Sequence, residues 1–469
     1  MPLPVRVRPV LVSAALLCAA SSVTGQTPVP TPLPQDQLTL QANANVVQGS
    51  GARALGMGGA FLARADDATA ASWNPAGLSY LRLPEVSFVY SGGNLHSRTT
   101  NPSTSDFSDD RRHGSAPDFL AATYPVSIAS LSGSAQLSFQ RVISFTSDRT
   151  IDDHFFPAPE TLNEPADLPF VRRSTIATQG GFDVLALGSG WQLTRTVRAG
   201  LTINRWFNGY EQIYDKPVDL GISHQEFRYD IRAWNVNAGV IWTPTERLNV
   251  GAVYKTGFQA EVRQSRLRRD PFADAGGVVI RERSVTSDDL GLNPRLNFPP
   301  SVGIGASFRP RSALTVSVDY TRTRWSEGSI RDFFDLGKTG APNIFGRVPY
   351  PTLVTGVTPK DTEQIRGGLE YVVIRGRLRL PIRVGYFNDE QYFPSISRYV
   401  SIAGGQPLAV NGAPRFDALT AGAGIIIGPL LLDAAYNYEH GSYADLDGRA
   451  VSVKSHRVVT SVIYRHTHR

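Results

Sequence analysis

The side chains that could do chemistry form no catalytic pattern in the 469 residues. The eight histidines show neither an H-E-x-x-H motif nor a paired metal-ligand spacing. We also find no G-x-S-x-G motif and no Ser/His/Asp set. Asp445-Leu446-Asp447-Gly448 resembles the start of a calcium loop but lacks the later ligands. We therefore predict a protein that is not an enzyme and that holds no metal and no cofactor.

Six charged side chains occupy positions that a strand would turn inward. They are Asp319, Arg366, Glu370, Arg383, Asp433 and Glu439. Charges beside a lipid-facing surface are costly unless they face a polar lumen. Because Asp319, Arg366 and Arg383 fall on consecutive predicted strands, we expect Asp319 within pairing distance of one of these arginines.

Two interpretations of these luminal charges stay open. They could pair only with one another across the strands of a barrel wall. They could instead hold an inserted plug through charges near the N-terminus, namely Arg53, Arg64, Asp66 or Asp67.

The elements that must position these residues are strands. Several segments alternate strictly, with Leu314, Val316, Val318 and Tyr320 on one face and Asp319 on the other. We count about fourteen such segments of roughly ten residues, the span of a tilted membrane strand. They lie near 83–91, 117–126, 132–143, 181–191, 197–208, 228–242, 247–259, 299–309, 313–325, 363–373, 378–388, 416–427, 430–440 and 454–464.

Aromatic residues mark the ends of one apolar face. Trp234 and Trp242 bracket about 26 Å of strand at roughly 3.3 Å per residue, which covers about 20 Å of hydrocarbon after tilting. This approaches the height of the apolar band of a membrane barrel with its aromatic girdles. A soluble sandwich or propeller is the alternative, but it does not need aromatics at both strand ends.

The connections alternate between long and short. Residues 92–116, 144–180 and 260–298 are long, whereas 310–312 and 428–429 are tight turns. Outer-membrane barrels have long outer loops and short periplasmic turns. The predicted fold is therefore all-β: a 14-stranded antiparallel transmembrane outer-membrane β-barrel with a small N-terminal luminal plug.

The predicted plug is centred on residues 51–81, GARALGMGGAFLARADDATAASWNPAGLSYL, a stretch rich in Gly and Ala without alternation. Small residues allow close backbone approach. A short helix is expected after Asp66-Asp67 and should end at Asn74-Pro75. We expect the Asn74-Pro75-Ala76-Gly77 turn to hold the plug in place. The predicted plug and gating residues are Gly58, Gly59, Asp66, Asp67, Asn74, Pro75, Ala76 and Gly77.

This stretch resembles the N-terminal hatch of the FadL-type outer-membrane transporters of hydrophobic compounds. Later segments, including LNFPPSVGIGASFRP (296–310), LTVSVDYTRTRWSE (314–327) and DTEQIRGGLEYV (361–372), are similar to strands of that family in the family's order. The resemblance runs from Gln41 to the end of the chain.

The resemblance implies passive uptake of hydrophobic compounds, such as long-chain fatty acids, through a plugged barrel in the bacterial outer membrane. Apolar loop residues would collect the ligand, a luminal pocket would take it up, and a shift of the plug or a gap where a strand bends inward would release it. Ser132-Gly133-Ser134 is a candidate for such a bend. Candidate loop aromatics are Phe155-Phe156, Phe333-Phe334, Ile344-Phe345 and Tyr392-Phe393.

The alternative is a non-transporting scaffold or shuttle of a secretion system, because PorV-type relatives resemble the same stretch. The expected partners are a hydrophobic small molecule, outer-membrane lipid, lipopolysaccharide and the barrel assembly machinery. Acidic pairs in predicted outer loops, Asp109-Asp110 and Asp152-Asp153, could bridge lipopolysaccharide through divalent ions. The barrel is expected to be a monomer.

The N-terminus carries the signature of export. Residues 1–25 are predicted to be a signal peptide, with Arg6 and Arg8 before a short apolar run from Leu11 to Ala20. The chain then divides into a Pro-rich linker (26–40), the plug (41–82) and the barrel (83–469). The only cysteine, Cys18, lies in the leader, and the net charge of +6 is spread out, so no nucleic-acid partner is expected.

Overall fold

The fold is taken from a computed structural model. It describes residues 49–101, 106–155, 170–218, 220–274, 276–336, 342–345, 348–349, 360–376, 378–391, 395–398, 409–411, 413–444 and 449–466. The predicted signal peptide, the linker and the start of the plug lie outside these ranges.

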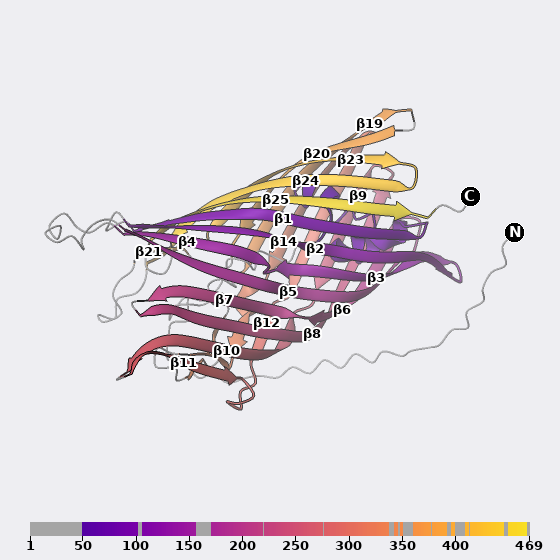
Figure 1. Ribbon diagram of the computed structural model, residues 1–469. Helices are drawn as coiled ribbons and strands as arrows, with labels where there is room; N and C mark the ends of the chain where they lie inside the picture. Colours follow the sequence, from indigo (N-terminus) through magenta and orange to yellow (C-terminus); the bar gives the residue numbers. More distant parts are fainter. Residues whose placement is uncertain are drawn as a thin grey trace.

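The chain closes into an antiparallel barrel of fourteen wall strands (Figure 1), as predicted. Nine wall strands are continuous: β1 (Glu85–Thr100), β2 (Phe107–Ile128), β5 (Phe170–Gln192), β8 (Gly221–Thr245), β19 (Thr362–Arg375), β20 (Leu378–Glu390), β23 (Arg415–Ile427), β24 (Leu430–Ala444) and β25 (Ala450–Arg465). The barrel closes where β1 pairs with β25 from Glu85↔Arg465 to Thr100↔Ala450. The first and last wall strands therefore have their periplasmic ends side by side.

The other five wall strands are each built of two segments. They are β3 (Leu131–Ser144) with β4 (Ser147–Phe155), β6 (Val197–Phe207) with β7 (Gly209–Val218), β9 (Leu248–Lys255) with β10 (Phe258–Asp274), β13 (Ser301–Arg311) with β12 (Arg295–Phe298), and β14 (Leu314–Thr323) with β15 (Ser329–Arg331). Smaller strands lie in the outer connections: β11 (Gly277–Thr286), β16 (Phe333–Leu336), β17 (Pro342–Phe345), β18 (Val348–Pro349), β21 (Ser395–Arg398) and β22 (Ala409–Asn411).

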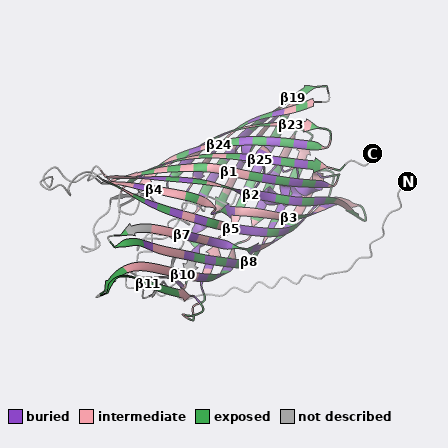
Figure 2. Cartoon of the chain, viewed as in Figure 1, coloured by how far each residue is buried: buried purple, intermediate pink, exposed green. Residues whose placement is uncertain are grey.

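Burial alternates along the wall strands, which appears as purple and green bands in Figure 2. On β14, Val318 is 53% exposed while Asp319 is 1% exposed. Trp234 and Trp242 on β8 both face outward. These values confirm the predicted faces, with apolar side chains toward lipid and polar ones toward the lumen.

The wall strands are longer than expected. β2 has 22 residues and β8 has 25, against roughly ten for the apolar part alone. The extra length carries the wall beyond the membrane on the side of the long connections. Asp109, Asp110, Asp152 and Asp153 therefore lie in β2 and β4 and not in loops.

The predicted bend at Ser132-Gly133-Ser134 is wrong. Gly133 pairs without interruption with Val126 of β2 and with Trp191 of β5. A β-carbon at Gly133 would lie 2.2 Å from the carbonyl oxygen of Gly190, so close packing of the wall accounts for this glycine. The interruption in this wall strand falls at Phe145–Thr146, between β3 and β4.

The plug, described from residue 49 to residue 82, lies inside the barrel near the end where β25 finishes (Figure 1). It contains helix α2 (Ala52–Gly56), helix α3 (Ala70–Trp73) and the 3₁₀ helix η1 (Pro75–Tyr80). As predicted, the short helix after Asp66-Asp67 ends before Asn74, whose φ of −145° is extended. Within the described ranges, no helix is long and apolar enough to span a bilayer.

Candidate functional site

The predicted turn at Asn74 contacts the barrel wall directly. Asn74 is fully buried, and its Nδ2 donates to the carbonyl oxygens of Leu62 (2.9 Å), Val240 on β8 (3.2 Å) and Ala252 on β9 (3.4 Å). Its Oδ1 accepts from the backbone N–H of Ala76. One side chain thus closes its own turn and joins the plug to two wall strands.

The inner face of the wall carries glycines at positions where any side chain would collide with the plug. A β-carbon at Gly200 on β6 would lie 2.3 Å from the carbonyl group of Pro75, and one at Gly385 on β20 would lie 2.1 Å from the nitrogen of Gly58. Other wall glycines whose added β-carbon would meet the plug within 3.2 Å are Gly188, Gly190, Gly239, Gly251, Gly303, Gly305, Gly368 and Gly422. The plug and wall therefore meet at backbone distance over much of the circumference.

The predicted glycines of the plug occupy a tight turn. Gly58 and Gly59 have φ values of +64° and +73°, which favour glycine. The N–H of Gly58 donates to Oγ1 of Thr420 on β23 at 3.0 Å. Gly77 packs against the carbonyl oxygen of Ala65, which leaves no room for a β-carbon.

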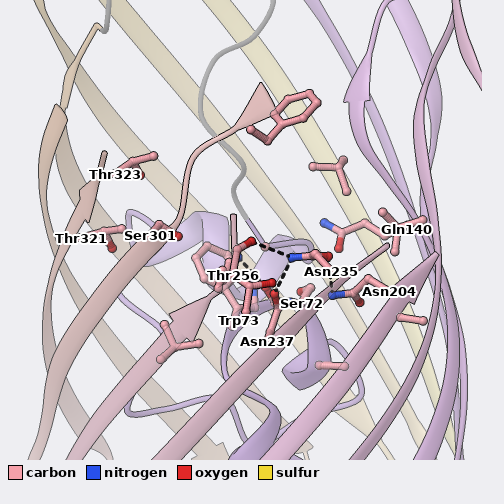
Figure 3. A pocket seen from close by; sticks show the side chains of 18 of the residues that line it. Ser72, Trp73, Gln140, Asn204, Asn235, Asn237, Thr256, Ser301, Thr321 and Thr323 are labelled. Atoms are coloured by element: carbon pink, nitrogen blue, oxygen red, sulfur yellow. Dashed lines mark hydrogen bonds between the residues drawn. The ribbon is translucent and has the colours of Figure 1, made fainter. Parts of the chain in front are cut away.

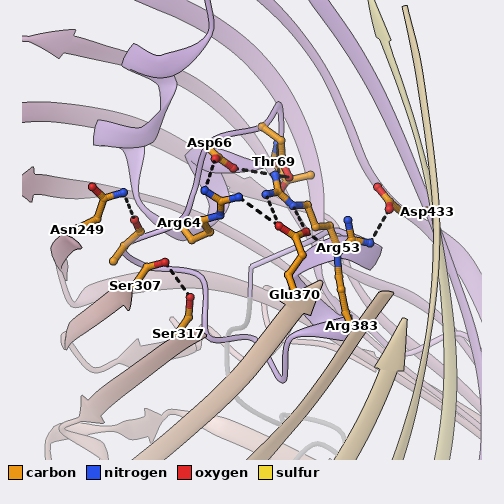
Figure 4. Close-up of polar contacts among 12 residues, drawn as sticks. Arg53, Arg64, Asp66, Thr69, Asn249, Ser307, Ser317, Glu370, Arg383 and Asp433 are labelled. Atoms are coloured by element: carbon orange, nitrogen blue, oxygen red, sulfur yellow. Dashed lines mark hydrogen bonds and ion pairs between the residues drawn. The ribbon is translucent and has the colours of Figure 1, made fainter. Parts of the chain in front are cut away.

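Glu370 on β19 is the centre of an ion-pair network between plug and wall (Figure 4). It accepts from Arg53 at 3.1 Å, from Arg64 at 3.2 Å and from Arg383 on β20 at 2.8 Å. Arg383 also pairs with Asp433 on β24 at 2.6 Å. Two of the six predicted luminal charges, Glu370 and Arg383, thus form this network with the plug arginines. A third, Asp433, is connected to it through Arg383.

The two predicted plug carboxylates contact the plug itself. Asp66 pairs with Arg53 at 2.7 Å and with Arg64 at 3.2 Å, while Asp67 accepts from the N–H and hydroxyl of Thr69 and pairs with Arg53 at 3.5 Å. Burial opposes ionisation of Asp66, but the two guanidinium groups outweigh it and hold its pKa below the usual range. Asp66 therefore keeps its charge and neutralises arginines that would otherwise repel each other beside Glu370.

Asp319 binds plug backbone and does not form the expected ion pair. It lies directly opposite Arg366 in the β14–β19 ladder. Its Oδ2 accepts from the N–H groups of Phe61 (2.6 Å) and Leu62 (2.8 Å), while no ion pair joins it to any described arginine. The two plug N–H groups therefore bind the carboxylate of Asp319 in place of the guanidinium of Arg366. The prediction considered only side chains on neighbouring strands of the wall.

Arg366 and Glu439 are luminal and buried, as expected, but no ion pair joins them to the plug over its described residues, 49–82. Nη2 of Arg366 donates to Gln364 on the same strand. The guanidinium of Arg366 also lies against the plug, because a β-carbon at Gly59 would be 2.5 Å from its Nη1. The predicted luminal set is therefore brought together on one wall, but only part of it contacts the plug by hydrogen bonds.

A cavity lies between the plug and the upper lumen (Figure 3). Leu62 and Trp73 of the plug form part of its floor, with Lys255 and Arg366 on the wall beside them. Asn204, Asn235 and Asn237 form a linked row on β6 and β8. The amide of Asn235 is oriented by Asn204, Trp206 and Asn237, so this polar edge is ordered by its own contacts.

The apolar wall of the cavity is aromatic. Phe258 stacks on Phe298, and Trp206 lies tilted over Phe258, each with ring centroids 4.7 Å apart. Trp325 completes this wall, from the short 3₁₀ helix η4 (Trp325–Glu327). Each of these four residues lies beside or within an interruption of its wall strand, where the alternation of faces is reset. The alternation alone could not identify them as luminal.

Some predicted functional residues are only partly described. Phe333 is buried and packs on Tyr229 with ring centroids 6.2 Å apart. The side chains of the other predicted loop aromatics and the stretch from Asp445 to Gly448 lie outside the described residues. Among described residues, no group of three or more His, Cys, Asp or Glu side chains could hold a metal ion.

A closed barrel with an outward apolar band, a polar lumen and an inserted plug defines an outer-membrane protein of a Gram-negative bacterium. The fold is that of the FadL-type transporters. A FadL homologue from Pseudomonas aeruginosa matches with a TM-score of 0.56 and 14% identity, over 89% of this chain and 99% of that one. The toluene transporter TodX from Pseudomonas putida matches with a TM-score of 0.56 and 13% identity, over 89% and 98%.

A third solved structure, the toluene transporter TbuX from Ralstonia pickettii, matches with a TM-score of 0.53 and 13% identity, over 90% of this chain and 99% of that one. No family model and no curated protein sequence matches the chain. The likeness is therefore one of fold, and two of these three neighbours are described as toluene transporters.

Proposed function

We propose that this barrel takes up hydrophobic compounds passively across the outer membrane. The observation that carries the proposal is the cavity above the plug, which has stacked aromatics on one side and polar and charged side chains over much of the rest of its lining. A ligand with an apolar body and at most one polar end matches such a lining. The toluene transporters among the structural neighbours favour the same class of ligand.

The proposed path has three steps. Apolar residues of the outer connections collect the ligand, and the cavity takes it up. Release follows a local shift of the plug or passage through the wall. The strand ladder of the wall is interrupted where β2 pairs with β3 only from Phe119↔Gln140 and with β4 only up to His113↔Asp148. Residues of β2 between these pairs, including Asp118, lack ladder partners on that side.

Long-chain fatty acids and neutral aromatic hydrocarbons would use the cavity differently. The ammonium group of Lys255 lies at the floor, where it donates to the carbonyl oxygen of Ser72 at 3.4 Å. A carboxylate would gain a charge-assisted contact there, whereas toluene would gain none. If fatty acids are the ligand, Lys255→Met should weaken oleate binding about tenfold and leave toluene binding unchanged.

The proposal is tested by ligand binding to purified protein and by uptake in cells. Trp206→Ala removes an aromatic wall of the cavity and should reduce binding and uptake of both oleate and toluene. Trp234→Ala is the matched control, because Trp234 is 60% exposed on the lipid-facing side of β8. Transport would be contradicted if uptake were equal in cells with the wild-type protein, cells with Trp206→Ala and cells without the protein. Co-purification with secretion components, without ligand binding, would instead support the PorV-type scaffold.

A further inference from the structure

The outward face of four neighbouring strands carries a cluster of basic side chains just above the apolar band. We call it the basic panel, and it consists of His440 on β24, Lys454 and His456 on β25, His96 on β1, and Arg111 and His113 on β2. All six residues are exposed. Four of the eight histidines of the chain lie in this one surface.

Cross-strand register aligns the panel in two rows. Lys454 lies opposite both His440 and His96, and His96 lies opposite Arg111, which forms the upper row. In the lower row, Asn94 lies between His456 and His113. With strands about 4.8 Å apart and rows about 6.8 Å apart, the panel extends about 14 Å across the wall.

The panel begins where the lipid-facing surface ends. The row directly below it contains Tyr436, Val458 and Gly92, which lie opposite one another on β24, β25 and β1. Tyr436 and Val458 are 43% and 50% exposed, as expected for side chains in contact with lipid. Oη of Tyr436 also lies 2.6 Å from Nδ1 of His456, so the two surfaces are continuous.

The panel lies on the extracellular side of the membrane. At the opposite ends of the same strands, where short turns join β2 to β3 and β23 to β24, Leu430, Tyr464 and Val86 face outward. The basic surface therefore faces the outer leaflet.

Carboxylates neutralise only part of this surface. Asp109 accepts from Arg98 and contacts His96 at 3.1 Å, and Asp152 binds Arg173 at 2.7 Å, with Arg111 at 3.7 Å. Arg111 nevertheless has a side chain that is 52% exposed. Lys454 forms no ion pair with any described residue. These arginine contacts also occupy Asp109 and Asp152, which argues against the divalent-ion bridge that the sequence left open.

We infer that the basic panel binds the phosphate groups of lipopolysaccharide in the outer leaflet. Lipopolysaccharide carries phosphates where its acyl chains meet its sugars, which is the height at which the panel follows the apolar band. Lys and Arg clusters at a membrane surface attract anionic lipid headgroups, and imidazole N–H groups add hydrogen bonds to phosphate oxygens. This contact lies on the outer surface of four wall strands and is separate from the proposed uptake path.

The test compares binding of purified lipopolysaccharide to the detergent-solubilised full-length protein and to an Arg111→Gln/Lys454→Gln variant. Loss of two charges at a lipid surface should weaken binding roughly tenfold or more. Dephosphorylated lipopolysaccharide should bind wild type and variant equally weakly. The matched control is Arg195→Gln/Arg247→Gln, which removes two exposed charges from periplasmic turns and should leave binding unchanged.

Heat-modifiable migration on gels shows in parallel that each variant barrel is folded. The inference is overturned if the folded Arg111→Gln/Lys454→Gln variant binds as tightly as wild type. Equal binding of phosphorylated and dephosphorylated lipopolysaccharide to wild type also overturns it. The same holds if the Arg195→Gln/Arg247→Gln control loses as much binding as the Arg111→Gln/Lys454→Gln variant.

Discussion

Oδ1 of Asn74 on the plug lies 2.0 Å from the point where Gly239 on β8 would carry a β-carbon. Any other residue at position 239 would therefore displace the amide that links the plug to Val240 and Ala252. This contact is one of several in which a wall glycine receives plug backbone. The fit indicates that the plug and barrel form one packed unit, with movement restricted to local shifts.

Two adjacent glycines on β19 test this fit. A β-carbon at Gly368 would lie 2.2 Å from the carbonyl oxygen of Met57, whereas one at Gly367 would meet nothing within 4 Å. We expect Gly368→Ala to destabilise the packed plug by about 1–3 kcal/mol and to raise leakage of small polar solutes. Gly367→Ala should resemble wild type. Identical melting temperatures and leakage for the two variants would contradict the close fit.

Asn74→Ala should alter permeability more than barrel assembly. The change removes three donor contacts and the acceptor of Ala76, at a cost of about 1–3 kcal/mol. The barrel ladder does not include this residue, so the level of folded protein in the membrane should stay normal. Uptake of an apolar tracer, or leakage of a small polar solute, is the measurement. Ser127→Ala, on the exposed face of β2, serves as control.

Normal barrel levels together with unchanged uptake and leakage in Asn74→Ala would refute a gating role. The turn would then be a packing feature only.

Glu370→Gln should loosen the ion-pair network. It leaves Arg53, Arg64 and Arg383 without their shared carboxylate in a buried site, where breaking such pairs costs about 3–5 kcal/mol. We expect higher single-channel conductance in planar bilayers and a lower melting temperature. Glu363→Gln is the control, because Glu363 lies on the same strand but faces outward and its side chain is 49% exposed. A silent Glu370→Gln variant would show that the network does not restrain the plug.

The network should also weaken in acid through Asp66. The pKa of Asp66 is lower in the folded protein than its ordinary value of 3.8, so its contribution to stability is fully present above that value. The contribution is lost as the pH falls through the lower folded value. The difference in melting temperature between wild type and Asp66→Asn should therefore be largest near neutral pH and shrink below about pH 4.

The control for this acid effect is Glu246→Gln, a change in an exposed periplasmic turn. The melting temperature of Glu246→Gln should stay close to that of wild type at all pH values. If the difference in melting temperature between wild type and Asp66→Asn grew as the pH fell, the trend would have the wrong sign. Such a result would exclude a stabilising pair of Asp66 with Arg53 and Arg64.

The sequence alone determined the wall. Strict alternation around Val318 and Asp319 assigns each side chain to lipid or lumen, because successive residues of a strand point to opposite faces. The number of wall strands and the alternation of short and long connections follow from the same local pattern. The end of helix α3 at Asn74-Pro75 was likewise predictable, since proline restricts the residue before it.

Only the tertiary structure decided what the wall encloses. The partner of Asp319 is plug backbone about 260 residues away in sequence, and no local pattern relates the two. The aromatic wall of the cavity lies at interruptions between β6 and β7, β9 and β10, and β12 and β13, where the alternation of faces is reset. The glycines opposite the plug give no signal in the alternation of faces because they have no side chain. That a side chain would not fit at these positions is evident only from the packing of the plug against the barrel.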